Sequence, residues 1–254
     1  MRLILVQPQL RHLAGASNLD PIRVMLDGAR MQLEHADLLL LPERFDLRDD
    51  PSRYQTDIVA LARSLGCHVV GGSHHERRAG TSVNAGIVAD SHGNILEHYE
   101  KLRPYALERQ FVEPGGRLGE LTIGEFHIVI LICADFWFVD LLLRARAAPD
   151  LVLVPALSVT RKPSPAYSRA LWKHLAISRA YEFGTYVGIS DWAHPSQLPA
   201  LFTSGAGGFA DPTTIDPEKF FLPIATSGVD VHRLDWQALD TFRRDRIGRG
   251  FFWK

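Results

Sequence analysis

The sequence predicts an α/β fold in which layers of β-sheet are covered by helices. Short strand-like runs recur along the whole chain, and amphipathic helical stretches lie between several of them. Each kind of element must bury its apolar face against another element. The mixture is therefore typical of packed sheet and helix layers rather than of an all-β or an all-helical protein.

The predicted strands are short, rich in leucine or β-branched residues, and bounded by Gly, Pro, Asp or Asn. Runs of this kind are Arg2–Val6, Asp37–Leu41, Cys67–Gly71, Ser82–Ala89, Ile95–Glu100, His127–Ile132, Leu151–Val154, Tyr186–Ser190 and Val229–Leu234. The strands around Asn84 and Gly93 follow one another closely, so we expect them to form hairpins.

Helical patterns separate several of these strands. The clearest begins at Asp20-Pro21, where the aspartate suits the capping position and the proline suits the first turn. Apolar residues then recur at helical spacing as far as Leu33. Amphipathic stripes predict further helices over Arg53–Leu65, Val139–Ala147 and Pro165–Glu182.

One domain spanning residues 1–254 is the expected organisation. A chain of 254 residues with 46% hydrophobic and 22% charged residues has the make-up of a compact globular protein. No repeat, low-complexity tract or linker divides it, and Glu113–Gly116 and Asp211–Pro217 are expected to be loops between elements.

Charge and cysteine content exclude several classes of protein. A net charge of -1 provides no overall field for nucleic acid or an anionic membrane, although Arg243–Arg249 is locally basic. The apolar runs are shorter than the roughly 18 residues of a membrane span, and no export segment opens the chain. Cys67 and Cys133 are too few for a disulfide framework. We expect a cytoplasmic protein with no nucleic-acid or membrane partner.

Cys133, Glu43 and Lys101 each stand at or just after the end of an apolar strand, where α/β proteins place their site residues. Taken alone, each has an ordinary interpretation. Cys133, like Cys67, fits a small buried hydrophobe, Glu43 an exposed loop acid, and Lys101 a surface lysine. Taken together, they supply a nucleophile, a base and a cation.

Three segments resemble the signature segments of the carbon-nitrogen hydrolases, the nitrilase-like superfamily, in order and in separation. They are Leu41-Pro42-Glu43, Tyr99–Leu102 and Leu131–Asp135. Further positions agree over nearly the whole chain: Gly71-Gly72, Asn84, Gly93, Glu108, Pro114-Gly115, Arg179–Glu182, Ser204-Gly205 and Asp211-Pro212. The resemblance implies a four-layer αββα sandwich that pairs with a second subunit into a homodimer or a higher oligomer.

The resemblance also implies a Glu43–Lys101–Cys133 triad supported by Glu108, for which an acid on a helix surface is the alternative. No metal and no organic cofactor is expected. Glu43 is the expected general base, because a thiol with a pKa of about 8.5 is only partly ionised at neutral pH. Lys101 and the backbone N–H of Ala134 are the expected donors to the oxyanion. The expected reaction is acylation of Cys133 by a small amide, release of ammonia or an amine, and hydrolysis of the thioester by water.

The segment after the cysteine departs from the family pattern. Many members follow Cys-x-Asp with an aliphatic residue, an arginine and Phe-Pro, whereas this chain has Phe136-Trp137-Phe138-Val139. The missing arginine predicts a more apolar or flatter acyl group, or a plugged site. By analogy, Tyr105, Phe136, Trp137 and Ala156 are expected to line the substrate pocket, and core packing is the alternative for the aromatic residues.

Asp135 is closer to the amidase-type branches than to the nitrilases, so amide hydrolysis is favoured. Nitrile or carbamoyl (ureido) hydrolysis at the same site, and a catalytically idle scaffold of the same fold, remain as alternatives.

Other enzyme classes fit the sequence less well. Gly188–Trp192 contains Gly-x-Ser but lacks the second glycine of a nucleophile elbow. His74-His75-Glu76 lacks the spacing of a zinc site, so these residues are expected to be solvated loop residues. Ser204–Gly208 does not follow the dinucleotide-binding pattern, so its glycines are expected to serve a turn or close packing.

Overall fold

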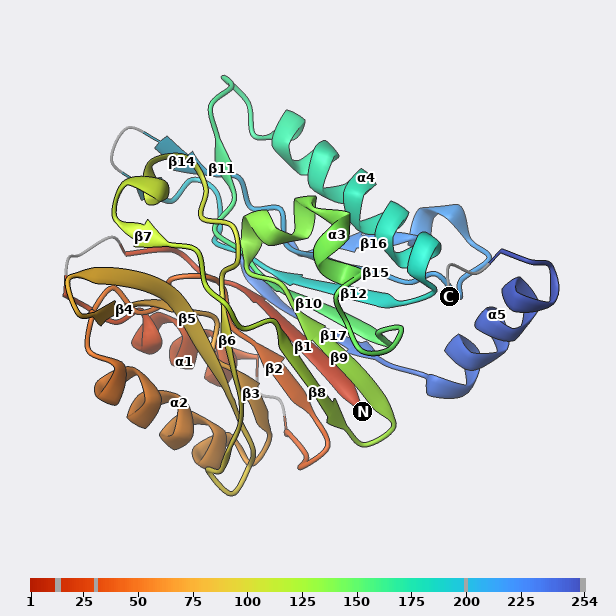
Figure 1. Ribbon diagram of the computed structural model, residues 1–254, viewed down its shortest axis with the longest axis horizontal. Coiled ribbons are helices and arrows are strands. Elements are labelled where there is room, and N and C mark those ends of the chain that lie inside the picture. The colour runs from red at the N-terminus through yellow and green to blue at the C-terminus, as the bar shows by residue number, and fades with distance from the viewer. Residues whose placement is uncertain (12–14, 30–31, 199–200, 252–254) are drawn as a thin grey trace.

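Two large sheets pack face to face, and helices cover the outer face of each (Figure 1). The computed structural model describes residues 1–254 except 12–14, 30–31, 199–200 and 252–254. Helices α1 and α2 cover one sheet, and α3 and α4 cover the other. This arrangement confirms the predicted αββα sandwich.

The first sheet has the strand order β17-β1-β2-β3-β5-β4, and β6 and β7 also pair with β5. Strands β1, β2 and β3 are parallel at its centre. The strands of this sheet are β1 (Arg2–Gln7), β2 (Leu38–Leu40), β3 (His68–Val70), β4 (His74–Arg78), β5 (Thr81–Ala89), β6 (Ile95–Glu100), β7 (Val112–Glu113) and β17 (Gly228–Arg233).

The second sheet has the order β16-β15-β12-β10-β9-β8, with β9, β10 and β12 parallel at its centre. Its strands are β8 (Gly119–Ile123), β9 (Phe126–Ile130), β10 (Leu151–Pro155), β12 (Tyr186–Ser190), β15 (Gly208–Ala210) and β16 (Phe221–Pro223). A smaller sheet joins β11 (Val159–Thr160), β14 (Leu201–Thr203) and β13 (Gln197–Leu198).

The α-helices are α1 (Leu19–Gly28), α2 (Pro51–Leu65), α3 (Val139–Leu142), α4 (Ala166–Phe183) and α5 (Trp236–Gly248). Short 3₁₀ helices span η1 (Ala106–Gln110), η2 (Cys133–Trp137) and η3 (Pro217–Lys219). Among the described residues, none of these helices combines the length and apolar character that would carry it across a membrane.

Alternating side chains on the central strands build two cores. Leu3 and Leu5 of β1 pack in the core between the sheets, whereas Ile4 and Val6 pack in the core beneath α1 and α2. This is the period of two that a strand buried on both faces requires. At Gly188 of β12, an added Cβ would lie 2.6 Å from the side chain of Leu3, so the glycine lets the two sheets approach closely.

The predicted elements differ from the structure mainly at their ends. Helix α1 begins at Leu19, with Asn18 rather than Asp20 at the capping position, and ends at Gly28 rather than Leu33. Helix α3 ends at Leu142 rather than Ala147. After Leu142, the N–H groups of Arg144 and Ala145 bond to carbonyls three residues back, so tight turns replace the α-helix. The sequence analysis missed several elements, most of which are short or lie at the edge of a sheet: β4, β7, β8, β11, β13, β14, β15, β16 and α5.

The ends of the central strands meet at one end of the sandwich. Strand β5 is antiparallel to both β3 and β6, so β6 runs in the same direction as β2 and β3. The Ser190 hydroxyl, at the end of β12, donates to the Leu40 carbonyl at 2.8 Å and accepts the Val6 N–H at 3.0 Å. The residues that follow β2, β6, β9 and β10 are therefore brought to the same region.

Candidate active site

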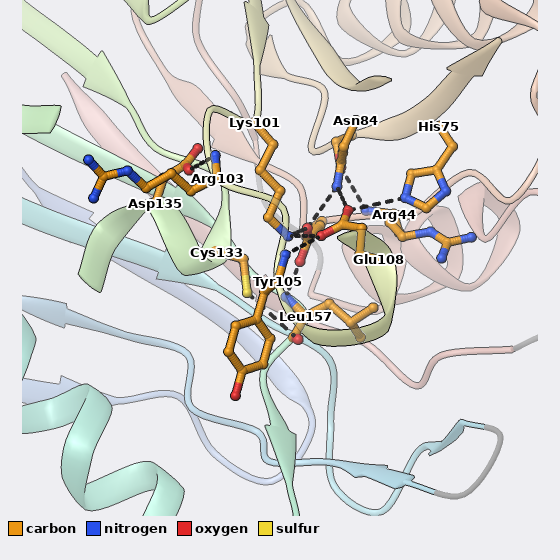
Figure 2. Close-up of polar contacts among 12 residues, drawn as sticks. Arg44, His75, Asn84, Lys101, Arg103, Tyr105, Glu108, Cys133, Asp135 and Leu157 are labelled. Atoms are coloured by element: carbon orange, nitrogen blue, oxygen red, sulfur yellow. Dashed lines mark hydrogen bonds and ion pairs between the residues drawn. The ribbon is translucent and has the colours of Figure 1, made fainter. Parts of the chain in front are cut away.

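Glu43, Lys101 and Glu108 form a buried charged cluster at this end of the sandwich (Figure 2). Lys101 Nζ lies 2.7 Å from Glu43 Oε1 and 2.5 Å from Glu108 Oε2. Glu43 is 2% exposed and Lys101 is 3% exposed. A lysine held between two carboxylates in this way is a fixed cation rather than a surface lysine.

Two further side chains complete the hydrogen bonds of the carboxylates. Asn84 Nδ2 donates to Glu43 Oε1 and to Glu108 Oε1, each at 2.8 Å. His75 Nε2 lies 3.3 Å from Glu108 Oε1, and the Tyr105 N–H donates to Glu108 Oε2 at 3.1 Å. The free-energy cost of burying polar groups is smaller in such a network, because each group keeps a hydrogen-bond partner.

The charges of this cluster stabilise one another. Burial opposes the charge on Lys101, but Glu43 and Glu108 outweigh it and hold the pKa of Lys101 above its ordinary value. Burial likewise opposes ionisation of Glu108, but its bonds to His75, Lys101 and Asn84 hold its pKa well below the usual range. Lys101 and Glu108 are therefore charged at neutral pH.

A close backbone contact positions Glu43. Gly72 has a φ of 61°, and a Cβ at this position would lie 2.1 Å from the Pro42 carbonyl oxygen. Only glycine fits there without displacing the backbone that precedes Glu43. On the other side, Trp192 Nε1 donates to the Glu43 carbonyl at 2.7 Å, so the backbone of Glu43 is held from both sides.

Cys133 begins η2 with an unusual backbone conformation. Its φ is 48°, in the left-handed region that non-glycine residues rarely adopt. Such a conformation costs of order 1–3 kcal/mol and occurs most often at functional sites. The Ala134 N–H follows in the first turn of η2, where N–H groups lack intrahelical partners and so can donate to a ligand.

The backbone of Leu157 links Cys133 to Glu43. The thiol lies 3.7 Å from the Leu157 carbonyl oxygen, and the Leu157 N–H donates to Glu43 Oε2 at 3.1 Å. Burial and the charge of Glu43 raise the pKa of the Cys133 thiol well above its ordinary value, although Lys101 acts in the opposite direction. The resting thiol is therefore protonated and needs a base before it can attack.

Asp135 supports the segment that carries Lys101. Its carboxylate accepts the Leu102 N–H at 3.0 Å and the Arg103 N–H at 2.7 Å (Figure 2). Burial raises the pKa of Asp135 to about 6, although these bonds and the charge of Lys101 lower it. Asp135 thus ties η2 to the chain immediately after Lys101, which is a positioning role.

A cavity of about 450 Å³ opens in front of Cys133. Its lining includes Cys133, Ala134 and Leu157, together with apolar and aromatic side chains from η2, from the residue that follows η2, and from α4. The latter are Trp137, Phe138, Tyr167, Leu171 and Trp172, with Tyr105 also at the lining. Arg161 and Lys162 also line it, and no Asp or Glu is present among its described lining residues.

The four residues expected to line the pocket divide into two pairs. Tyr105 and Trp137 line the cavity, whereas Phe136 and Ala156 are fully buried and lie outside its lining. Successive residues of a 3₁₀ helix are about 120° apart, so Ala134 and Trp137 share one face and Phe136 faces another. Phe136 instead stacks on Trp172 at 6.2 Å, which is the core-packing alternative.

The expectation that His74-His75-Glu76 is solvated loop is wrong. These residues belong to β4, and His74 is buried and stacked on Tyr54 at 4.1 Å. Edge-strand residues can be buried by the neighbouring helix, and α2 contributes Tyr54 here. Within the described ranges, no group of three or more His, Cys, Asp or Glu side chains is arranged to hold a metal ion.

A family model described as carbon-nitrogen hydrolase matches residues 3–195. The chain belongs to the carbon-nitrogen hydrolase family. A 2-oxoglutaramate amidase from Bacillus subtilis is 28% identical over 167 residues, which is 61% of this chain and 62% of that protein. The match therefore spans less than two thirds of that relative.

Solved carbon-nitrogen hydrolases have the same fold. A superfamily protein from Xanthomonas campestris, with an arsenic adduct in its active site, has a TM-score of 0.78 and 20% identity, covering 100% of this chain and 98% of that one. A variant amidase from Nesterenkonia sp. AN1, whose active-site cysteine has added acrylamide, has a TM-score of 0.72 and 23% identity, covering 99% and 100%.

Sequence reasoning missed several residues of this candidate site. It gave no role to Leu157, although this residue lies two residues after β10, much as Glu43 lies three residues after β2. His75 and Asn84 carried no local pattern for contact with Glu108, because β4 and β5 reach η1 only through tertiary packing.

Proposed function

We propose that this carbon-nitrogen hydrolase cleaves the C–N bond of an amide through a thioester on Cys133. The observation that carries the proposal is the coupling of Cys133 to the buried Glu43–Lys101 pair, through the Leu157 backbone, at the wall of an apolar cavity. A nucleophile, a base and a cation in that arrangement are suited to acyl transfer.

Glu43 acts as the base in the first step. The raised pKa of Cys133 keeps the thiol protonated, so Glu43 must accept its proton as sulfur attacks the amide carbon. The C–S bond forms as the carbonyl π bond opens, which places negative charge on the former carbonyl oxygen. Glu43 then returns the proton to the amine as the C–N bond breaks.

Lys101 and the Ala134 N–H stabilise the oxyanion. Lys101 stays charged because two carboxylates flank it, so its donor is preorganised before the substrate arrives. Loss of one donor of this kind costs about a hundredfold to a thousandfold in rate. In the second half of the cycle, Glu43 takes a proton from water as the water oxygen attacks the thioester carbon. The C–S bond then breaks, the acid is released, and Glu43 returns the proton to the sulfur of Cys133.

The cavity lining supports an acyl group with an apolar or flat body. Trp137 packs edge-on against Trp172 at 5.5 Å, and both side chains line the space in front of Cys133. Arg161 and Lys162 supply positive charge without a lining carboxylate, which favours a substrate that also carries an acidic group. The Bacillus relative acts, by its name, on such an amide.

Ammonia release by wild type and variants tests the proposal. A panel of short and aromatic amides, with and without a carboxylate, is compared with nitriles and ureido acids. Cys133→Ala should abolish release, and Cys67→Ala is the matched control because it removes the other free, buried cysteine. Equal release by wild type and Cys133→Ala would refute the thiol mechanism, and no release from any compound would favour an idle scaffold.

We also propose that the chain works as a cytoplasmic homo-oligomer. Family membership supports pairing, and Tyr167, Leu171 and Tyr181 of α4 are exposed in the single chain. Cys67 and Cys133 are both free, which suits a reducing compartment. Light scattering of the purified protein and fractionation of cells test the two statements, and a monomeric mass or a secreted protein would contradict them.

A further inference from the structure

A second cavity, of about 560 Å³, lies beside the residues that support the catalytic cluster. His75 and Arg44 line it, and Figure 2 shows both on the opposite side of the cluster from Cys133. It shares no lining residue with the cavity in front of Cys133. Its lining includes four arginines and two aspartates: Arg44, Arg48, Arg53, Arg77, Asp49 and Asp50.

Three of these arginines already have carboxylate partners. Arg48 lies 2.5 Å from Asp46 and from Asp57, two residues outside the lining. Arg53 lies 3.4 Å from Asp50, and Arg77 is paired with Asp49. The two aspartates of the lining are therefore occupied by Arg53 and Arg77, which leaves the charge of Arg44 without a partner in the cavity.

Arg44 has no ion pair or side-chain hydrogen bond within the described part of the chain. Its Nε is buried without a hydrogen-bond partner. Burial lowers the pKa of its guanidinium, although the charges of Glu43 and Glu108 act in the opposite direction. A guanidinium that is largely removed from water and not paired is unfavourable, so an anion that reached it would be bound with a gain in free energy.

The backbone at Arg44 is held in this position. Its φ is 53°, in the left-handed region, and its N–H donates to Ser73 Oγ at 3.0 Å. A strained conformation of a non-glycine residue persists only where the surrounding structure imposes it. The direction of the Arg44 side chain is thus set by the same turn that presents Glu43.

We propose that this cavity binds a small oxyanion, a carboxylate or a phosphate group, on the guanidinium of Arg44. The planar guanidinium donates two parallel hydrogen bonds to such groups, which a single point charge cannot do. The cavity is large enough for a small metabolite-sized anion. Since Arg44 follows Glu43 and His75 bonds to Glu108, the bound anion would lie next to residues that hold the catalytic cluster.

Calorimetric titration with inorganic phosphate and with malonate, at constant ionic strength, tests the site. We expect saturable binding that is at least tenfold weaker in Arg44→Gln. Binding by Arg44→Lys should be intermediate, because lysine keeps the positive charge but cannot donate two parallel hydrogen bonds. Arg249→Gln is the matched control, because it removes the same charge from an exposed arginine that is paired with Asp245 at the end of α5. The readout is binding, so it does not depend on hydrolysis.

Repeating the titration on protein alkylated at Cys133 separates the two cavities. Binding that survives alkylation and requires Arg44 supports the proposal, and a preference for one probe identifies the anion as carboxylate or phosphate. Absence of binding by both probes, equal binding by wild type and Arg44→Gln, or loss of binding on alkylation of Cys133 would overturn it. Circular dichroism of Arg44→Gln, compared with that of Arg44→Lys, checks that lost binding does not reflect unfolding.

Discussion

Replacing Lys101 with methionine removes the cation between Glu43 and Glu108 while keeping a side chain of similar length. The Lys101 side chain is 3% exposed, and its Nζ contacts both carboxylates at 2.7 and 2.5 Å. Without it, the buried Glu43 carboxylate and the partly buried Glu108 carboxylate, which share Asn84 as a donor, lose the cation that contacts both of them. Removing one partner of a buried ion pair costs about 3–5 kcal/mol, so we expect a loss of that size at neutral to alkaline pH.

This loss should depend on pH in a defined direction. Neighbouring like charges raise the pKa of a carboxyl group, so one of the two in Lys101→Met should titrate above the ordinary value. A pKa that is higher in the folded than in the unfolded state contributes stability at low pH, and this is lost as the pH rises through the raised pKa. In the wild type, the lowered pKa of Glu108 has the opposite effect, with stability lost as the pH falls.

Urea unfolding at pH 5 and pH 8 measures the effect. Lys101→Met should lose about 3–5 kcal/mol at pH 8. The loss should be smaller at pH 5. The difference should be about 1.4 kcal/mol for each unit by which the pKa of the carboxyl group in the folded variant exceeds its value in the unfolded chain, within the pH range measured. The double variant Lys101→Met/Glu108→Gln removes one of the facing carboxylates and should recover part of the loss at pH 8. An equal loss at both pH values, or no loss at all, would refute the view that Lys101 neutralises two buried charges.

Two further predictions concern η2. The carboxyl group of Asp135 has a pKa of about 6 in the folded protein, against an ordinary value of 3.8. Its contribution to stability is therefore present below about pH 4 and is lost as the pH rises through 6. Asp135→Asn lacks this dependence. Its stability relative to wild type in urea unfolding should therefore increase by about 2.4 kcal/mol between pH 4 and pH 7, whereas a constant difference would contradict the raised pKa. Phe136→Ala should destabilise the fold by about 3–5 kcal/mol in thermal or urea unfolding. Trp137→Ala, at a 40% exposed side chain, should instead mainly lower kcat/KM for apolar amides, and the reverse pattern would show that the two residues are assigned wrongly.

The αββα layers could be predicted because the evidence for them is local. Leu38–Leu41 is apolar at every position, which is what a strand buried on both faces requires, and Leu39 and Leu40 indeed enter different cores. Helix α2 was also predicted, although it begins at Pro51, two residues before the expected start at Arg53. Asp50 caps this start, and the proline that follows it occupies the first turn. Element ends such as that of α3 were less predictable, because over a few residues a series of turns and an α-helix show a similar spacing of apolar residues in the sequence.

The sequence also contains the three segments that carry Glu43, Lys101 and Cys133, and their order was enough to indicate the family. It could not indicate which neighbours hold them. Leu157, His75 and Asn84 contact these residues or Glu108 only because strands from two sheets end in the same region. Such contacts depend on the direction and register of strands far apart in the chain, which no local pattern specifies.

The sequence by itself thus determined the composition of the layers, the family and the residue types available for amide hydrolysis. The tertiary structure alone decided that Phe136 packs inward while Trp137 faces the cavity, and that Lys101 is neutralised from two sides. It alone leaves Arg44 beside the cluster without a partner in the described chain. The physical reason is that periodicity and propensity act between neighbours in sequence, whereas burial and pairing of charges are properties of the packed molecule.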